Sequence, residues 1–161
     1  MSEVPDDEGT GTKLVPSLDA ALQALIPTCL ADIIREHRDE ASLYLTSEMQ
    51  LADLTGPVAA LKVRGEFTDW RFLTLQIHSD LLQERKVYVL GLRAGRFATM
   101  TSSVHRLDLV KGLVQTKNSV YRLRMDARGA GEPPTAHLIH ICATFNDWGI
   151  GPALGVPPFF Y

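Results

Sequence analysis

The chain has 161 residues, of which 45% are hydrophobic and 22% are charged, as is typical of a globular protein rather than a disordered one. No run approaches the roughly 18 consecutive apolar residues that a membrane-spanning helix needs, and no basic leader with an apolar core is present. We therefore expect a cytoplasmic protein with no membrane partner, in which Cys29 and Cys142 stay reduced.

The net charge of −3 is distributed unevenly along the chain. Residues 1–56 contain 11 acidic and 3 basic side chains, whereas residues 57–161 contain 8 acidic and 13 basic ones. Two interpretations fit this asymmetry. Either an acidic helical layer neutralises a basic sheet beside it, or the sheet presents its positive charge to an anionic partner.

The first 13 residues are acidic and almost free of large apolar side chains. Such a segment buries too little apolar surface to offset the entropy lost on ordering, so we expect a flexible tail over 1–13. We assign the rest of the chain, 14–161, to a single domain.

Helical patterns follow the acidic tail. We expect one helix from an N-cap at Ser17 to Pro27 and a second from an N-cap at Thr28, with an apolar stripe that ends at His37. A short helical segment is expected over 47–54, and the Gly-Pro pair that follows should end it.

From residue 61 onward, apolar and polar side chains alternate with a period of two, which predicts β-strands. Glycine and asparagine at the breaks tolerate the positive φ of tight hairpins. The predicted strands cover 61–67, 72–77, 86–93 and 96–104, followed by three short runs separated by Lys111-Gly112 and Lys117-Asn118. We expect an antiparallel meander of six or seven strands, curled into a barrel or half-barrel, with the helices packed on it.

The segment 136–147 fits two structures. As a helix it has a cap at Thr135, one apolar stripe and Gly149 just beyond its end, whereas as a strand its β-branched residues would share a face. We prefer the helix because of the caps. The overall prediction is an α+β fold with this late helix.

Aromatic residues occupy the last three positions of the given sequence, Phe159, Phe160 and Tyr161. Terminal segments are usually frayed and polar, so an aromatic one is expected to be ordered by docking, either on its own domain or on a second protomer. Trp148 and Trp70 are further large side chains of the kind that anchor interfaces. We assign Trp148 and the three terminal aromatics to an interface and expect a homodimer.

The basic half of the chain suggests an anion-binding surface. In the strand 120–125, Arg122 and Arg124 point to the same side because side chains alternate along a strand. Arg106 and Lys117 join them from neighbouring strands and turns. Further basic side chains in this half are Lys62, Arg64, Arg71, Arg93, Arg96 and Lys111.

No catalytic or metal-binding motif is convincing. The cluster TSSVHRLD, 101–108, lacks a nucleophile elbow, and the pair His137 and His140 lacks further ligands, so we interpret both histidines as surface residues. Glu66 and Asp69 would suit acid–base chemistry only inside a pocket. We assign no catalytic residue, metal or cofactor.

These features favour a non-enzymatic regulatory or accessory protein that acts through protein–protein contacts. The alternative is a nucleic-acid-associated regulator that uses the basic sheet face, although the acidic helices and the lack of exposed aromatic rings argue against it. A second alternative is a small enzyme, which would need a deep cavity where Glu66, Asp69 or His78 converge.

Overall fold

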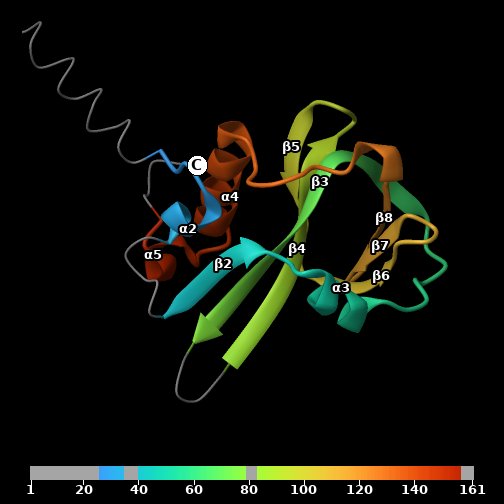
Figure 1. The fold of residues 1–161 in the computed structure, drawn as a ribbon, viewed down its shortest axis with the longest axis horizontal. Helices are drawn as coiled ribbons and strands as arrows, with labels where there is room; N and C mark the ends of the chain where they lie inside the picture. Colours follow the sequence, from blue (N-terminus) through green and yellow to red (C-terminus); the bar gives the residue numbers. More distant parts are fainter. Residues whose placement is uncertain (1–25, 35–39, 79–82, 157–161) are drawn as a thin grey trace, which may run out of the picture.

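The computed structural model describes residues 26–34, 40–78 and 83–156. They form an α+β fold built on one seven-stranded mixed sheet, in which the strand order is β5-β4-β3-β8-β7-β6 and β2 pairs with β3 (Figure 1). Helices α2, α4 and α5 lie at one side of the β3–β4 hairpin, and β6, β7 and β8 of the same sheet lie at the other (Figure 1).

The centre of the sheet is a long hairpin. Strands β3 (Val63–His78) and β4 (Gln83–Arg93) pair antiparallel along nearly their whole length. The predicted strands 61–67 and 72–77 are therefore one strand, which continues through a bulge between Thr68 and Arg71. At this bulge Asp69 has a φ of 46°, a left-handed conformation that non-glycine residues adopt rarely.

Two different strands pair with the same edge of β3. Strand β2 (Ala41–Leu45) pairs antiparallel with its second half, and β8 (Val120–Leu123) pairs parallel with its first half. The remaining strands are β5 (Phe97–Met100), β6 (Val104–Asp108) and β7 (Leu113–Thr116), each antiparallel to its neighbours. The sheet is thus mostly antiparallel, as predicted, but β2 was not expected and the parallel β3–β8 pair breaks the predicted meander.

The prediction of a barrel or half-barrel is wrong, because the sheet is neither closed nor strongly curled. The middle of β3, residues 70–75, is buried on both of its faces. One face packs against α2, α4 and α5 through Leu73 and Leu90, and the other packs against β6, β7 and β8 through Trp70 and Val89. Both faces of the β3–β4 hairpin are therefore covered, and its apolar side chains are buried although the sheet does not close.

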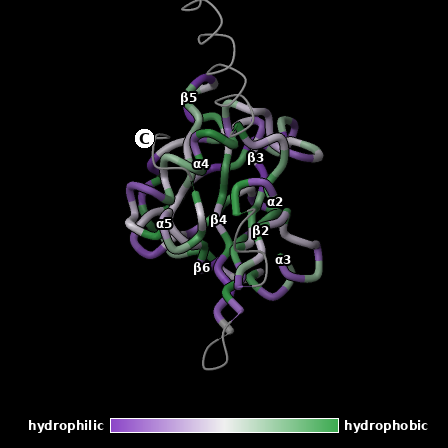
Figure 2. Tube along the Cα trace, turned by 90° about the vertical axis from the view of Figure 1, so that its left-hand side faces the viewer, coloured by the Kyte–Doolittle hydropathy of each residue, from purple (hydrophilic) through white to green (hydrophobic). Residues whose placement is uncertain are grey.

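The distribution of hydropathy follows this arrangement. In Figure 2 the hydrophobic stretches run through the middle of the molecule around β4, whereas the hydrophilic stretches lie at its periphery. Two apolar clusters, one on each face of the β3–β4 hairpin, therefore form the core.

The helices agree only in part with the predictions. The expected helix from Ser17 to Pro27 falls outside the described residues except for Ile26 and Pro27, which are not helical. The second is a single turn, α2 (Leu30–Ile33), whose N-cap is Cys29 rather than Thr28. Helix α3 (Glu48–Leu54) is confirmed, with a capping box between Ser47 and Gln50.

The late helix is also confirmed, as α4 (Thr135–Asp147), followed by α5 (Gly151–Leu154). Gly149, just beyond α4, has a φ of 80°, which explains why glycine ends this helix. A short 3₁₀ segment, η1 (Met125–Ala127), leads from β8 toward α4. Among the described residues, no helix has both the length and the hydrophobicity needed to cross a membrane.

Candidate functional site

The first half of β3 and the adjoining part of β8 carry arginines on a common face. Glu66 pairs with Arg122 and Phe67 pairs with Leu123, and the backbone N–H of Arg124 donates to the carbonyl of Phe67 at 3.0 Å. Because side chains alternate along both strands, Arg122 and Arg124 share one exposed face, while Leu123 between them is buried.

Next to this face lies a hollow of about 490 Å³, which we call the basic hollow. Its charged lining residues are Arg64 and Glu66 from β3, Arg93 from the end of β4, and Arg124 after β8. The β4–β5 turn at Ala94 and Gly95, whose φ values are 55° and 74°, closes one side.

Two of these arginines interact only with neutral groups in the described part of the chain. Arg64 donates from Nη1 to the Ser119 hydroxyl at 3.2 Å. Arg93 donates from Nη2 to the Arg64 carbonyl at 3.4 Å and lies 6.0 Å from the centre of the Tyr121 ring. No carboxylate of the described residues is within ion-pair distance of either guanidinium.

Arg124, by contrast, already has an acidic partner. Its Nε and Nη2 donate to the two carboxylate oxygens of Asp126 at 3.1 and 3.0 Å. This bidentate pair raises the pKa of Arg124 and lowers the pKa of Asp126. Arg124 therefore contributes less free positive charge to the hollow than Arg64 and Arg93 do.

The other predicted anion-binding residues do not gather around the basic hollow. Arg106 lies on β6, separated from β8 by β7, and its side chain covers Gly56. Lys117 is exposed in the β7–β8 turn, at the end of β8 away from Arg124. The sequence indicated the basic character of this half but not which arginines would line one hollow. Arg64 and Arg93 are brought together by the register of the β3–β4 pair, and Arg124 joins them through the parallel β3–β8 pair, which has no local sequence pattern.

One arginine of the basic half is not available to a partner. Arg71 is only 8% exposed and donates to the carbonyls of Gly131 and Ala130, each at 2.9 Å. It also pairs weakly with the Asp69 carboxylate at 3.3 Å. Arg71 therefore fixes the loop that leads into α4, and its role is structural.

His137 lies in the first turn of α4 and is 4% exposed, so the prediction of a surface histidine is wrong for this residue. Its Nδ1 has no hydrogen-bond partner in the structure. Burial lowers the pKa of His137, and the nearby Arg71 and His140 lower it further, whereas Asp69 raises it. Burial also lowers the pKa of His140.

We expect this burial to make stability depend on pH. Since the unfolded chain binds the proton of His137 more readily than the folded chain, stability should fall as the pH drops through about 6.5, the ordinary pKa of histidine. His137→Leu should remove part of this fall, up to about 1 kcal/mol between pH 7.5 and 5.5 in urea unfolding. His105→Gln, at an exposed position, is the control. An unchanged pH dependence in H137L would contradict the prediction.

The residues required by the enzyme interpretation do not converge. Glu66 lines the basic hollow, Asp69 lies at the bulge, and His78 is at the far end of β3, where its Nε2 is 2.8 Å from the Ser42 hydroxyl. No group of three or more potential metal ligands occurs among the described residues.

The predicted interface residues are placed only in part. Trp148 is 39% exposed, and its ring centre lies 5.4 Å from that of Tyr88 and 6.1 Å from that of Phe145. Phe159, Phe160 and Tyr161 lie outside the described residues. Trp70 is completely buried, so the suggestion that it anchors an interface is wrong.

Comparison of the chain with models of protein families, with curated proteins and with solved structures found no match. We therefore argue the function from the geometry of the basic hollow and the surface around it.

Proposed function

We propose that this protein is a non-enzymatic binding protein that recognises an acidic segment of a partner protein through the basic hollow. The observation that carries the proposal is the pair Arg64 and Arg93, which line one hollow and have no acidic partner among the described residues. Guanidinium groups bind carboxylates in forked geometry, and an acidic side chain in the hollow would reach both arginines.

Several features favour a protein partner over nucleic acid. The chain has a net charge of −3, so its long-range field repels a long polyanion, whereas a short acidic segment needs only the local positive charge of the hollow. Glu66 and Asp126 lie among the arginines and would repel a continuous phosphate backbone. The described surface near the hollow offers one largely exposed ring, Phe97, whereas single-stranded nucleic acid needs successive rings for stacking.

Self-association remains a prediction that fits the same proposal. The first 56 residues carry 11 acidic side chains, so a second copy of the chain could supply the acidic segment. Such a dimer should weaken as salt rises, since salt screens contacts between exposed charges. Light scattering after gel filtration at low and high salt measures this directly, and a monomer mass under both conditions would exclude the homodimer.

Charge reversal at the hollow tests the proposal. Arg64→Glu combined with Arg93→Glu should weaken the binding of a fluorescein-labelled polyglutamate peptide at least about tenfold, because each exposed charge pair contributes up to about 1 kcal/mol and reversal adds repulsion. The matched control is Arg85→Glu with Lys111→Glu, which changes the net charge equally at exposed positions outside the hollow. Fluorescence anisotropy at about 50 and 200 mM salt provides the measurement.

Three results would go against the proposal. The peptide fails to bind the wild-type protein at low salt, or the control double variant weakens binding as much as the hollow variant does. The third is tighter, salt-dependent binding of a labelled single-stranded RNA or double-stranded DNA that R64E/R93E abolishes, which would favour the nucleic-acid alternative. A second double variant, Arg122→Glu with Arg124→Glu, should weaken the same binding without unfolding the domain, because both side chains are exposed. Circular dichroism checks that the variant is folded.

A further inference from the structure

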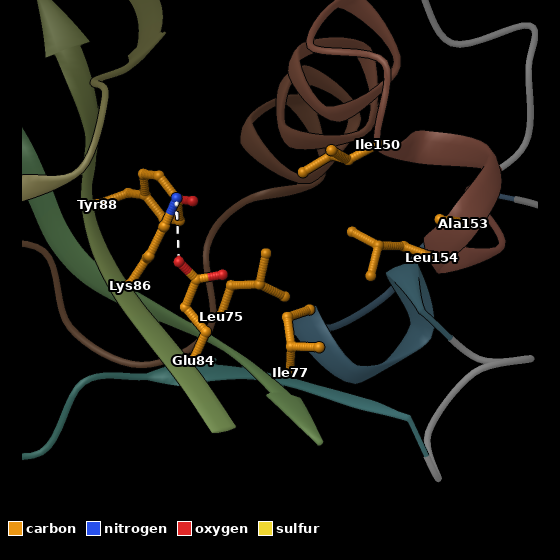
Figure 3. A pocket seen from close by; sticks show the side chains of 8 residues that line it. All are labelled: Leu75, Ile77, Glu84, Lys86, Tyr88, Ile150, Ala153 and Leu154. Atoms are coloured by element: carbon orange, nitrogen blue, oxygen red, sulfur yellow. Dashed lines mark ion pairs between the residues drawn. The ribbon is translucent and has the colours of Figure 1, made fainter. Parts of the chain in front are cut away.

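A second cavity lies on the other part of the molecule, between the far end of the β3–β4 hairpin and α5. It has a volume of about 210 Å³. Figure 3 shows Leu75 and Ile77 on one side, facing Ile150 and Leu154 on the other. We call it the apolar cavity, because its walls are aliphatic and its polar groups lie at one edge.

The polar edge is formed by β4. Lys86 and Glu84 pair with each other at 3.5 Å, as the dashed line in Figure 3 shows. Burial, together with the charge of Glu84, raises the pKa of Tyr88 to about 12, so its phenol stays protonated and neutral. The edge therefore offers a neutral ring and an already paired lysine rather than a free charge, which suits an apolar or aromatic occupant.

The size of the cavity fits one aromatic ring. A cavity of about 150 Å³ lined by aliphatic side chains holds one benzene molecule, so about 210 Å³ accommodates a single phenyl or phenol group. Tyr88 at the edge can contact such a ring in the tilted geometry that it already has with Trp148.

The chain leaves the described structure beside this cavity. Leu154 lines it, and Val156, two residues later, is buried in the same apolar cluster. Gly155, with a φ of 76°, ends α5, and the Val156 N–H donates to the Gly151 carbonyl at 2.9 Å. The backbone is therefore fixed to within a residue of the position where 157–161 begins.

The segment that follows has the sequence Pro-Pro-Phe-Phe-Tyr. Five residues span at most about 17 Å, which is enough to return to the cavity wall formed by Leu154. The two prolines restrict the unfolded conformations of the segment, which lowers the entropic cost of docking. We propose that one aromatic side chain of 157–161 from the same chain occupies the apolar cavity.

A double-mutant cycle tests this proposal. The tail variant is Phe159→Ala with Phe160→Ala and Tyr161→Ala, and the cavity variant is Ala153→Phe, which places a ring at the cavity wall. The tail variant should lower the melting temperature by roughly 3–6 °C in the wild-type background and by less than about 1 °C in the A153F background. Ala136→Phe, at an exposed position on α4 outside the cavity, is the matched control and should leave the tail effect unchanged.

Two outcomes would overturn the proposal. The first is an equal effect of the tail variant in the wild-type and A153F backgrounds, including no effect in either, because the cavity and the tail would then be uncoupled. The second is a fall in solution mass when the tail is altered, since the aromatic residues would then dock on another protomer. A mass that is unchanged, together with the coupling described above, supports docking within one chain. This test is independent of polyglutamate binding, because the apolar cavity and the basic hollow share no lining residue.

Discussion

Trp70→Ala should lower the free energy of unfolding by about 3–5 kcal/mol, the range measured for deleting a fully buried large aromatic side chain. The Trp70 ring is completely buried and lies edge-on to Phe72, with ring centres 5.7 Å apart. Its Nε1 donates to the Arg124 carbonyl at 2.7 Å, and the guanidinium of Arg128 lies 5.1 Å from its ring centre. The substitution therefore removes packing and a hydrogen bond in one step.

Two further variants separate these contributions in urea unfolding. Trp70→Phe keeps most of the packing but leaves the Arg124 carbonyl without its donor, so it should cost about 1–2 kcal/mol. Trp148→Ala is the matched control, because Trp148 is the other tryptophan of the chain and is partly exposed. A loss in W148A as large as in W70A would contradict the prediction, because Trp148 is 39% exposed and buries less of its ring.

Arg71→Ala should lower the free energy of unfolding by about 2–3 kcal/mol, because charge-assisted hydrogen bonds from a buried guanidinium contribute more than neutral ones. The side chain holds the loop before α4 through the carbonyls of Ala130 and Gly131. A Cβ at Gly129 would lie 2.6 Å from the Arg71 Cζ, so glycine is required where the loop crosses the guanidinium.

The local effect of this change can be measured as well as the global one. In R71A the loop at 129–134 should become more sensitive to limited proteolysis, since its contacts to β3 are lost. Arg85→Ala, at an exposed position on β4, is the matched control and should change stability by less than about 0.5 kcal/mol. Equal stability and equal cleavage in R71A and R85A would contradict a structural role for Arg71.

The strands and helices that the sequence predicted correctly have strong local patterns. Alternation predicted the strands of the basic half, the segment from Ser47 to the Gly-Pro stop predicted α3, and the caps around Thr135 and Gly149 predicted α4. Each pattern is a property of neighbouring residues, and tertiary packing does not conflict with it. The tight turns at Ala94-Gly95 and Lys111-Gly112 were predictable for the same reason.

The sequence predicted that the candidate site would be basic, but not which arginines would line it. Arg122 and Arg124 share a face because they are two residues apart on a strand, which any single strand dictates. Arg64 and Arg93 face the same hollow because β3 and β4 pair in a register that places Arg93 opposite Phe67, and Arg124 joins them because β8 lies parallel to β3. Arg71, from the same basic set, is removed from the surface by a loop 60 residues away along the chain.

The sequence by itself determined the α+β class, the mostly antiparallel strands, the late helix and the concentration of positive charge in residues 57–161. Only the tertiary structure decided that the sheet stays open, that β8 lies parallel to β3, and which arginines have no acidic partner among the described residues. The physical reason is that local periodicity indicates which side of a helix or strand is buried. It does not indicate which other helix or strand packs against that side, because this depends on contacts between residues that are distant in sequence.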